Sequence, residues 1–317
     1  MKKILAVFFC AFLCCCTFPL SVAEAEQMKS STNDNCTVIS EDFYFVHISD
    51  VHVKNKIFDR SEISKKRFLT ILENITHFAK KPAFIVITGD LVHWSGSGVF
   101  GRLNCRTVAE CLFRKNGQMY ADVNCTIPVY MTPGNHEYAF TRSLFNYHTY
   151  IDPTHRKDHN RYIILQSDVA LFFLDSGPNY YANLSILFDW HGLGLSDSDI
   201  TWLNQGFNKY TTQHKIVLMH HPAVGDADDL FINNRQAFVD LCESHHVELV
   251  LAGHTHSNHR IFDVNLTKYE MFPLNCSTVP TLYVQSDDCA EDCHYRNISL
   301  LNDGIWLGEN TEIDLVP

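Results

Sequence analysis

The chain has 317 residues, of which 46% are hydrophobic and 19% are charged. This composition excludes an intrinsically disordered chain and can supply the core of a globular domain. The formal net charge of −11 repels a nucleic-acid backbone, so we expect no polynucleotide partner. The charge does not exclude small phosphate compounds, because a bound metal cation would dominate the field around them.

The N-terminus has the pattern of a secretory signal peptide. Two lysines follow the initiating methionine, residues 4–18 are apolar, and small residues lead to Ala25. The apolar run is shorter than the roughly 20 residues that a membrane span requires, which disfavours a retained anchor. We therefore predict a signal peptide over residues 1–25, a single secreted domain over residues 26–317 and no stable membrane anchor.

The cysteines and the glycosylation triplets agree with a secretory route. Eight cysteines follow residue 25, an even number that fits an oxidised protein. Cys105 and Cys111, and likewise Cys289 and Cys293, are close enough in sequence to be candidate disulfide pairs. Seven Asn-x-Ser/Thr triplets offer sites for N-glycosylation on exposed surface.

The first part of the chain alternates strands and helices. Residues 43–48 and 84–88 are apolar runs typical of buried strands, and residues 61–80 carry apolar side chains at helical spacing. These three segments predict a βαβ unit. Further strands are predicted at residues 128–131, 162–165, 169–174, 215–219 and 247–251, with an amphipathic helix at residues 235–246.

The second part of the chain is rich in short strands. Antiparallel strands are predicted at residues 260–264, 269–272, 281–284 and 304–307. An α/β region followed by a β-rich part indicates an α/β domain of two packed sheets flanked by helices. No clear periodicity is present in residues 92–125, 137–160 and 177–199, so we expect long loops there, which often carry function.

Five polar motifs each follow one of the predicted strands of the first part. They are Asp50-Val51-His52, Gly89-Asp90, Gly134-Asn135-His136-Glu137, His220-His221 and Gly253-His254-Thr255-His256. An α/β sheet exposes side chains at the carboxyl ends of its strands, which is where these motifs fall. Carboxylate oxygens, imidazole nitrogens and one amide oxygen form a ligand set that suits zinc, iron or manganese.

The spacing within the motifs indicates how they could hold metal ions. In an extended segment residues i and i+2 point the same way, so Asp50 and His52 could bind one ion, as could His254 and His256 in a locally bent segment. Asp90 has two carboxylate oxygens and could bridge two ions. Each motif taken alone also occurs as a turn or a surface histidine, and only the ordered set indicates a site.

The five motifs, in this order and after strands, resemble the calcineurin-like metallophosphoesterase superfamily. The resemblance extends from about Phe45 to His256. It implies a four-layer α/β/β/α sandwich of two mixed β-sheets flanked by helices, which agrees with the architecture predicted above. It also implies a dinuclear centre of two divalent or trivalent metal ions.

The resemblance assigns a ligand set to each ion. One ion would take Asp50, His52, Asp90 and His256, and the other would take Asp90, Asn135, His220 and His254, so that Asp90 is shared. His136 would then be an outer-sphere catalytic histidine that stabilises the phosphate or protonates the leaving oxygen.

Two histidines have less defined predicted roles. Within the doublet, His220 is preferred as the ligand because the family's ligand lies two residues before a proline, here Pro222, while His221 contacts substrate or packs. His93 follows the Gly-Asp motif closely enough to approach the substrate as well.

The implied activity is hydrolysis of small phosphodiesters or phosphomonoesters by a metal-bridging hydroxide. The sequence does not choose between these ester classes, nor does it indicate an oligomeric state. The alternative is a secreted binding protein that keeps the fold without catalysis, which the complete ligand set disfavours.

Overall fold

The computed structural model describes residues 42–93, 98–112, 127–139, 143–179, 191–211, 213–225, 230–257 and 260–313. The predicted signal peptide over residues 1–25 lies outside the described residues. Within the described part, none of the helices is long and apolar enough to cross a bilayer.

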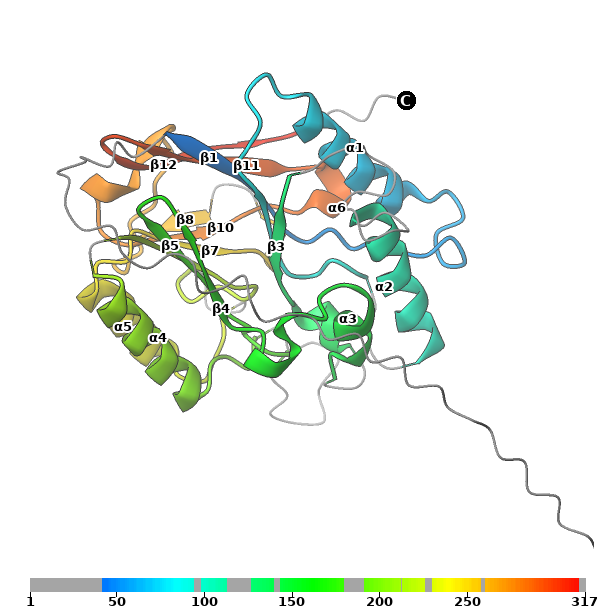
Figure 1. Ribbon diagram of the computed structural model, residues 1–317, viewed down its shortest axis with the longest axis horizontal. Coiled ribbons are helices and arrows are strands. Elements are labelled where there is room, and N and C mark those ends of the chain that lie inside the picture. Colours follow the sequence, from blue (N-terminus) through cyan, green and yellow to red (C-terminus); the bar gives the residue numbers. More distant parts are fainter. Residues whose placement is uncertain are drawn as a thin grey trace, which may run out of the picture. The chain divides into compact units, whose positions relative to one another are not determined.

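Two six-stranded sheets form the centre of the described structure (Figure 1). The first sheet has the order β3-β2-β1-β11-β12-β9, built from β3 (Val129–Thr132), β2 (Ile85–Thr88), β1 (Phe43–Ile48), β11 (Tyr295–Leu301), β12 (Gly304–Thr311) and β9 (Leu274–Asn275). Strands β1, β2 and β3 are parallel, while β11 runs antiparallel to β1. This sheet is therefore mixed.

The second sheet has the order β4-β5-β6-β7-β10-β8. Its strands are β4 (Tyr162–Gln166), β5 (Val169–Phe173), β6 (His214–Leu218), β7 (Leu249–Ala252), β10 (Leu282–Gln285) and β8 (Arg260–Phe262). The four central strands are parallel, and the two edge strands β4 and β8 are antiparallel to their neighbours. This sheet is also mixed.

Helices cover the outer face of each sheet. Helices α1 (Ile63–His77) and α2 (Val99–Leu112) pack on the first sheet, and α4 (Asp197–Lys209) and α5 (Arg235–Ser244) pack on the second (Figure 1). The shorter helical segments are η1 (Asn135–Tyr138), α3 (Phe145–Tyr150), η2 (His155–Asp158), η4 (Cys276–Thr278) and α6 (Cys289–Asp292). The predicted α/β/β/α sandwich is confirmed.

The strands read as continuous apolar runs because both of their faces are buried. In β5, Leu171 and Phe173 enter the core between the sheets, whereas Ala170 and Phe172 enter the core beneath α4 and α5. Alternate side chains of a strand point to opposite faces, so each strand contributes to two apolar layers.

Helix α2 was not predicted, because it lies within residues 92–125, where we expected a loop. Its buried face contains polar side chains: Asn104 Oδ1 accepts the backbone N–H of Asn55 at 2.8 Å, and Thr107 Oγ1 accepts Asn55 Nδ2 at 2.9 Å. Polar residues on the buried face obscure the apolar periodicity from which a helix is predicted.

The strand predicted over residues 269–272 is wrong. Tyr269 and Phe272 pack against the core between the sheets without belonging to a strand, and the chain pairs in β9 instead. Apolar side chains of a packed loop therefore produced the strand pattern.

Neither of the two candidate disulfide pairs is formed in the described structure. Cys105 and Cys111 both lie on α2. Six residues of α-helix rise about 9 Å, which exceeds the Cα separation of about 7 Å that a disulfide can bridge. Cys36 and Cys125 lie outside the described residues.

Candidate active site

The five motifs lie just beyond the carboxyl ends of five parallel strands, which explains why they meet. Asp50 follows β1, Asp90 follows β2 and Asn135 follows β3 in the first sheet, and His220 follows β6 and His254 follows β7 in the second. The structure brings the predicted ligands Asp50, His52, Asp90, Asn135, His220, His254 and His256 together, with distances of 2.8 to 3.8 Å linking one donor to the next.

One group of ligand atoms is formed by Asp50, His52 and His256. His256 Nε2 lies 3.3 Å from Asp50 Oδ1 and 3.1 Å from His52 Nε2. The ligand atoms of all three residues lie within 4.8 Å of one another, close enough to share an ion. This is the set predicted for the first ion apart from Asp90.

A second group is formed around the amide of Asn135. Its Oδ1 lies 2.8 Å from His220 Nε2 and 3.1 Å from His254 Nδ1. The His220 ring is oriented because its Nδ1 donates a hydrogen bond to the Thr88 carbonyl at 2.8 Å. That bond directs Nε2 toward the other ligands, as a bond from the second ring nitrogen commonly does in metal sites.

Asp90 lies between the two groups. Its Oδ2 is 3.4 Å from His220 Nε2 and 3.8 Å from His52 Nε2, so a single oxygen faces both sets. Its Oδ1 accepts the backbone N–H of His136 at 2.8 Å, which fixes the carboxylate orientation. Asp90 therefore lies between the two donor groups, and its bridging role stays a prediction.

The backbone at Asp50 and His52 is not extended, contrary to the i, i+2 argument from the sequence, whereas His254 and His256 lie in a bent segment as expected. Asp50, His52, Asp90, His254 and His256 have φ values between 46° and 73°, in the left-handed region that non-glycine residues rarely adopt. Such strained residues gather at functional sites. At Gly253, a Cβ atom would lie 2.3 Å from Asp50 Oδ2, so only glycine lets the chain approach this carboxylate.

The electrostatics of the site favour a cation at its centre. Burial lowers the pKa of His52 to about 3, whereas at His220 the Asp90 and Asp50 carboxylates outweigh burial and raise the pKa to about 10. Asp50 Oδ1 is buried and faces the Nε2 atoms of His256 at 3.3 Å and His52 at 3.8 Å, without a hydrogen bond of good geometry. A buried carboxylate oxygen without a hydrogen bond is costly unless a cation compensates it, so the residues fit a metal ion.

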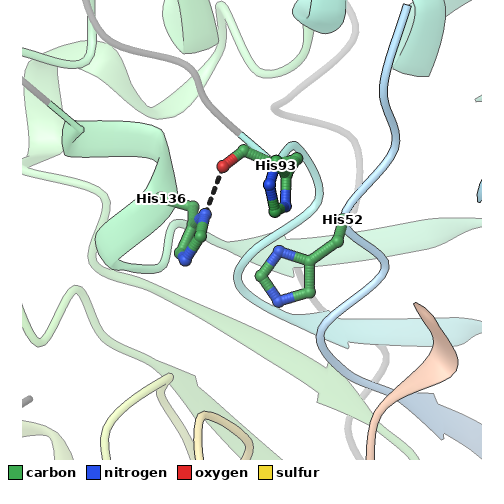
Figure 2. A group of neighbouring side chains, drawn as sticks. All are labelled: His52, His93 and His136. Carbon is green, nitrogen blue, oxygen red and sulfur yellow. Dashed lines mark hydrogen bonds between the residues drawn. The ribbon is translucent and has the colours of Figure 1, made fainter. Parts of the chain in front are cut away.

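His136 and His93 border the same space as His52 (Figure 2). His136 Nδ1 donates a hydrogen bond to the backbone carbonyl of His93, and its Nε2 lies 3.8 Å from Asp90 Oδ2. The His136 and His52 ring centroids are 4.5 Å apart. Burial, followed by the charge of Lys54, lowers the pKa of His93 to about 4.

His221 does not line the cavity, although one of its ring nitrogens lies within 4.8 Å of ligand atoms of His220 and His254. It is fully buried, its Nδ1 lies 2.9 Å from Ser176 Oγ, and its Nε2 lies 3.3 Å from Asn179 Oδ1. Its ring packs at 4.5 Å from that of His254. Both ring nitrogens thus have protein partners, which suits a residue that packs beside a ligand.

Two carboxylates with roles in the site were not predicted from the sequence. Glu137 is fully buried and accepts the backbone N–H groups of Asp90, Val92 and Gly134, so it joins the second and third motifs. Asp288 Oδ2 lies 3.4 Å from His256 Nδ1. Its partner histidine is 32 residues away in the sequence, and no local pattern relates the two residues.

A cavity of about 520 Å³ opens onto the ligands. The predicted site residues in its lining are His52, Asp90, His93, Asn135, His136, His254 and His256. The rest of the lining comes from the segment between β1 and α1, from α1 and from α6. Among the predicted site residues, His93 and His136 therefore border the space that a substrate would enter, and His221 does not.

Comparisons with known proteins agree with this geometry. The family model described as calcineurin-like phosphoesterase matches residues 43–258. A probable glycerophosphodiester phosphodiesterase of Arcobacter nitrofigilis is 27% identical over 223 residues, which cover 67% of this chain and 71% of the relative.

A solved structure shows the same fold. The purple acid phosphatase from yellow lupin (Lupinus luteus) seeds has a TM-score of 0.50 and 12% identity, covering 86% of this chain and 53% of its own. The chain therefore belongs to the calcineurin-like phosphoesterase family and is a metal-dependent phosphoric ester hydrolase.

Proposed function

We propose that this protein is a secreted phosphoesterase that uses two metal ions to hydrolyse small phosphodiesters or phosphomonoesters. The observation that carries the proposal is the pair of ligand groups that meet at Asp90, whose Oδ2 faces His220 at 3.4 Å and His52 at 3.8 Å. A carboxylate placed between two donor sets is the arrangement that a dinuclear centre requires.

The proposed ligands of one ion are Asp50, His52, Asp90 and His256, and those of the other are Asp90, Asn135, His220 and His254. Oxygen and imidazole donors suit zinc, iron or manganese. When bound, such ions lower the pKa of a water molecule and neutralise charge on the phosphate oxygens. The assignment prefers His220 over His221 because His220 Nε2 faces Asp90, whereas His221 is bonded to Ser176 and Asn179.

His136 is the proposed general acid. Its Nδ1 is committed to the His93 carbonyl, so Nε2 is the atom that presents a proton to the leaving oxygen. Good leaving groups need little protonation. We therefore expect His136→Ala to slow esters of poor leaving groups more than p-nitrophenyl esters, and equal losses would argue against this role.

Phosphodiesters are the first substrates to test. The glycerophosphodiester phosphodiesterase relative aligns over 67% of this chain, and the family match at residues 43–258 contains all the proposed ligands. The comparison to make is bis-p-nitrophenyl phosphate against p-nitrophenyl phosphate, with a panel of glycerol, choline and nucleotide esters to extend it.

The test of the proposed function combines metal analysis with turnover. Protein stripped with a chelator should lose both metals and activity, and should regain both with zinc, iron or manganese. Asn135→Ala should lower the bound metal and the turnover together. Undiminished turnover by the stripped protein or by Asn135→Ala would contradict the two-metal proposal, and a folded, metal-loaded protein that cleaves no ester would favour a binding role.

Secretion has its own test. Expression of the full chain in a eukaryotic secretory host should release protein that begins after residue 25 and shifts in mass on glycosidase treatment. Asn74 and Asn265 are exposed and thus accessible to glycosylation. Retention of an uncleaved chain inside the cell would contradict this part of the proposal.

A further inference from the structure

The cavity that opens onto the candidate metal centre is also lined by two cationic side chains. Lys54 lies in the segment after β1, and Arg67 lies on α1, and both line the cavity. Neither forms an ion pair with a carboxylate in the described structure. The same cavity is also lined by the carboxylate residues Asp59, Asp90 and Glu291.

Lys54 is fixed by its backbone, while its ammonium group is available to a ligand. Its backbone N–H donates to Ser64 Oγ at 3.0 Å, which ties this segment to α1. Its side chain lines the same cavity as the candidate ligands His52 and His256.

Arg67 is held in place through one end of its guanidinium. Its Nη1 donates to the carbonyl of Ala290 on α6, and its Nε is buried without a hydrogen-bond partner in the described structure. A guanidinium offers five N–H donors, and a buried donor that lacks a partner is costly. A ligand with acceptor oxygens would compensate for it.

The carboxylate of Asp59, which lines the same cavity, is already committed. It accepts hydrogen bonds from Ser61 Oγ, Ser64 Oγ and the backbone N–H of Ser64 at 2.7 to 3.0 Å. These bonds tie it to the start of α1, and the two cations remain without a counter-ion from this residue.

An apolar strip lies beside the cations. The Phe58 ring lines the cavity and packs edge-on against Phe100, with the ring centroids 5.1 Å apart. Phe100 is 62% exposed. An organic spacer between two charged groups would have apolar surface to contact here.

We propose that Lys54 and Arg67 form a subsite for a second anionic group, so that the enzyme prefers phosphoesters whose substituent carries another phosphate or carboxylate. This inference rests on the proposed function, because the scissile phosphate must occupy the metal side of the cavity. Lys54 and Arg67, which line the same cavity, then bind the distal anion through charge-assisted hydrogen bonds.

The test uses p-nitrophenyl phosphodiesters that differ only at the end of an alkyl chain. Esters with a terminal carboxylate, in a series of graded chain lengths, are each compared with the methyl-ended ester of equal length. At the chain length that spans the cavity, wild-type enzyme should prefer the carboxylate ester by about tenfold or more in kcat/KM. This ratio corresponds to the free energy of one charge-assisted hydrogen bond.

Lys54→Met and Arg67→Met should each bring this ratio toward one. Lys56→Met is the matched control, since Lys56 is exposed and outside the cavity, and it should keep the ratio and the activity. Rescue of the ratio in Arg67→Lys would show that charge, and not the fold of α1, is responsible.

The failure of this inference is distinct from the failure of the proposed function. Turnover of both ester series with equal kcat/KM at every chain length would overturn the anionic subsite alone. A preference that survives in both methionine variants would also overturn it. If metal-loaded enzyme cleaved neither ester series, the proposed function would be contradicted, and the proposed subsite would be contradicted with it.

Discussion

The two ends of the candidate metal centre are held in different ways. At one end, the side chain of His220 is fully buried and is fixed by the Thr88 carbonyl and by Asn135. At the other end, the side chain of His256 is 38% exposed, and its outer nitrogen has Asp288 at 3.4 Å. The buried end is built into the strand ends, while the exposed end depends on a carboxylate next to the short helix α6.

This difference indicates that the buried end of the site is more strongly preorganised than the exposed end. A ligand fixed by backbone groups of a buried strand can move only if the sheet moves. A ligand fixed by one partly exposed carboxylate can adjust when its neighbour is changed. We therefore expect substitutions to have graded effects, large where they reach both ends and smaller toward the exposed end.

The largest effect is expected at Asp90, because it joins both ends. Loss of an outer partner of a metal ligand typically costs 10–100-fold, so Asp90→Asn, which removes the shared charge, should lower kcat by more than about a hundredfold. Metal content measured on the same sample should fall from two ions per chain. Asp240→Asn on α5 is the control for a lost surface charge. Equal turnover by Asp90→Asn and Asp240→Asn would show that Asp90 does not join the two ends of the metal centre.

The next effect tests the buried end directly. His220→Asn should lose the metal held by Asn135 and His254, together with most activity. His221→Asn should keep that metal and instead destabilise the fold by about 1–3 kcal/mol, because the buried hydroxyl of Ser176 would lose its imidazole partner. Metal stoichiometry and urea denaturation separate the two results. If His221→Asn lost the metal while His220→Asn kept it, the assignment would be reversed.

A smaller effect is expected at the exposed end. Asp288→Asn leaves an oxygen near His256 Nδ1 but removes the charge that orients the ring, so metal affinity should fall by about tenfold while the second ion is retained. Competition with a chelator of known affinity measures the change. Loss of both ions would show that the two ends are not independently held.

The smallest effect is expected at His214, which lies at the start of β6, whereas His220 follows the end of this strand. His214 Nδ1 lies 2.7 Å from Glu248 Oε1, and this hydrogen bond raises the pKa of His214. A raised folded-state pKa adds stability below the unfolded pKa of about 6.5, which is lost as pH rises through the folded pKa.

His214→Ala should therefore destabilise the protein by less than about 1 kcal/mol near pH 6 and by less still near pH 9. Thermal unfolding of the metal-loaded variant and wild type at both pH values measures the difference. Metal content should be unchanged, and a loss of metal would mean that the strand transmits changes to the buried end.

Secondary structure was predictable where a segment is buried on both faces or amphipathic. Strands β1, β2, β5 and β7 appear in the sequence as apolar runs, and α1 as an apolar stripe. Helix α2 was missed because Asn104 and Thr107 lie on its buried face. Strand β11 was missed because polar residues, including the buried Arg296, interrupt its apolar pattern.

By itself, the sequence determined the donors, their order and their attachment to strand ends, since these depend on residue type and local periodicity. Only the tertiary structure decided that Asp90 faces both groups, that five donors adopt left-handed backbone, and that Asp288 supports His256. It also decided that Lys54 and Arg67 line the same cavity as the donors. The physical reason is that these relations join residues far apart in the chain, and the packing of the two sheets sets their distances.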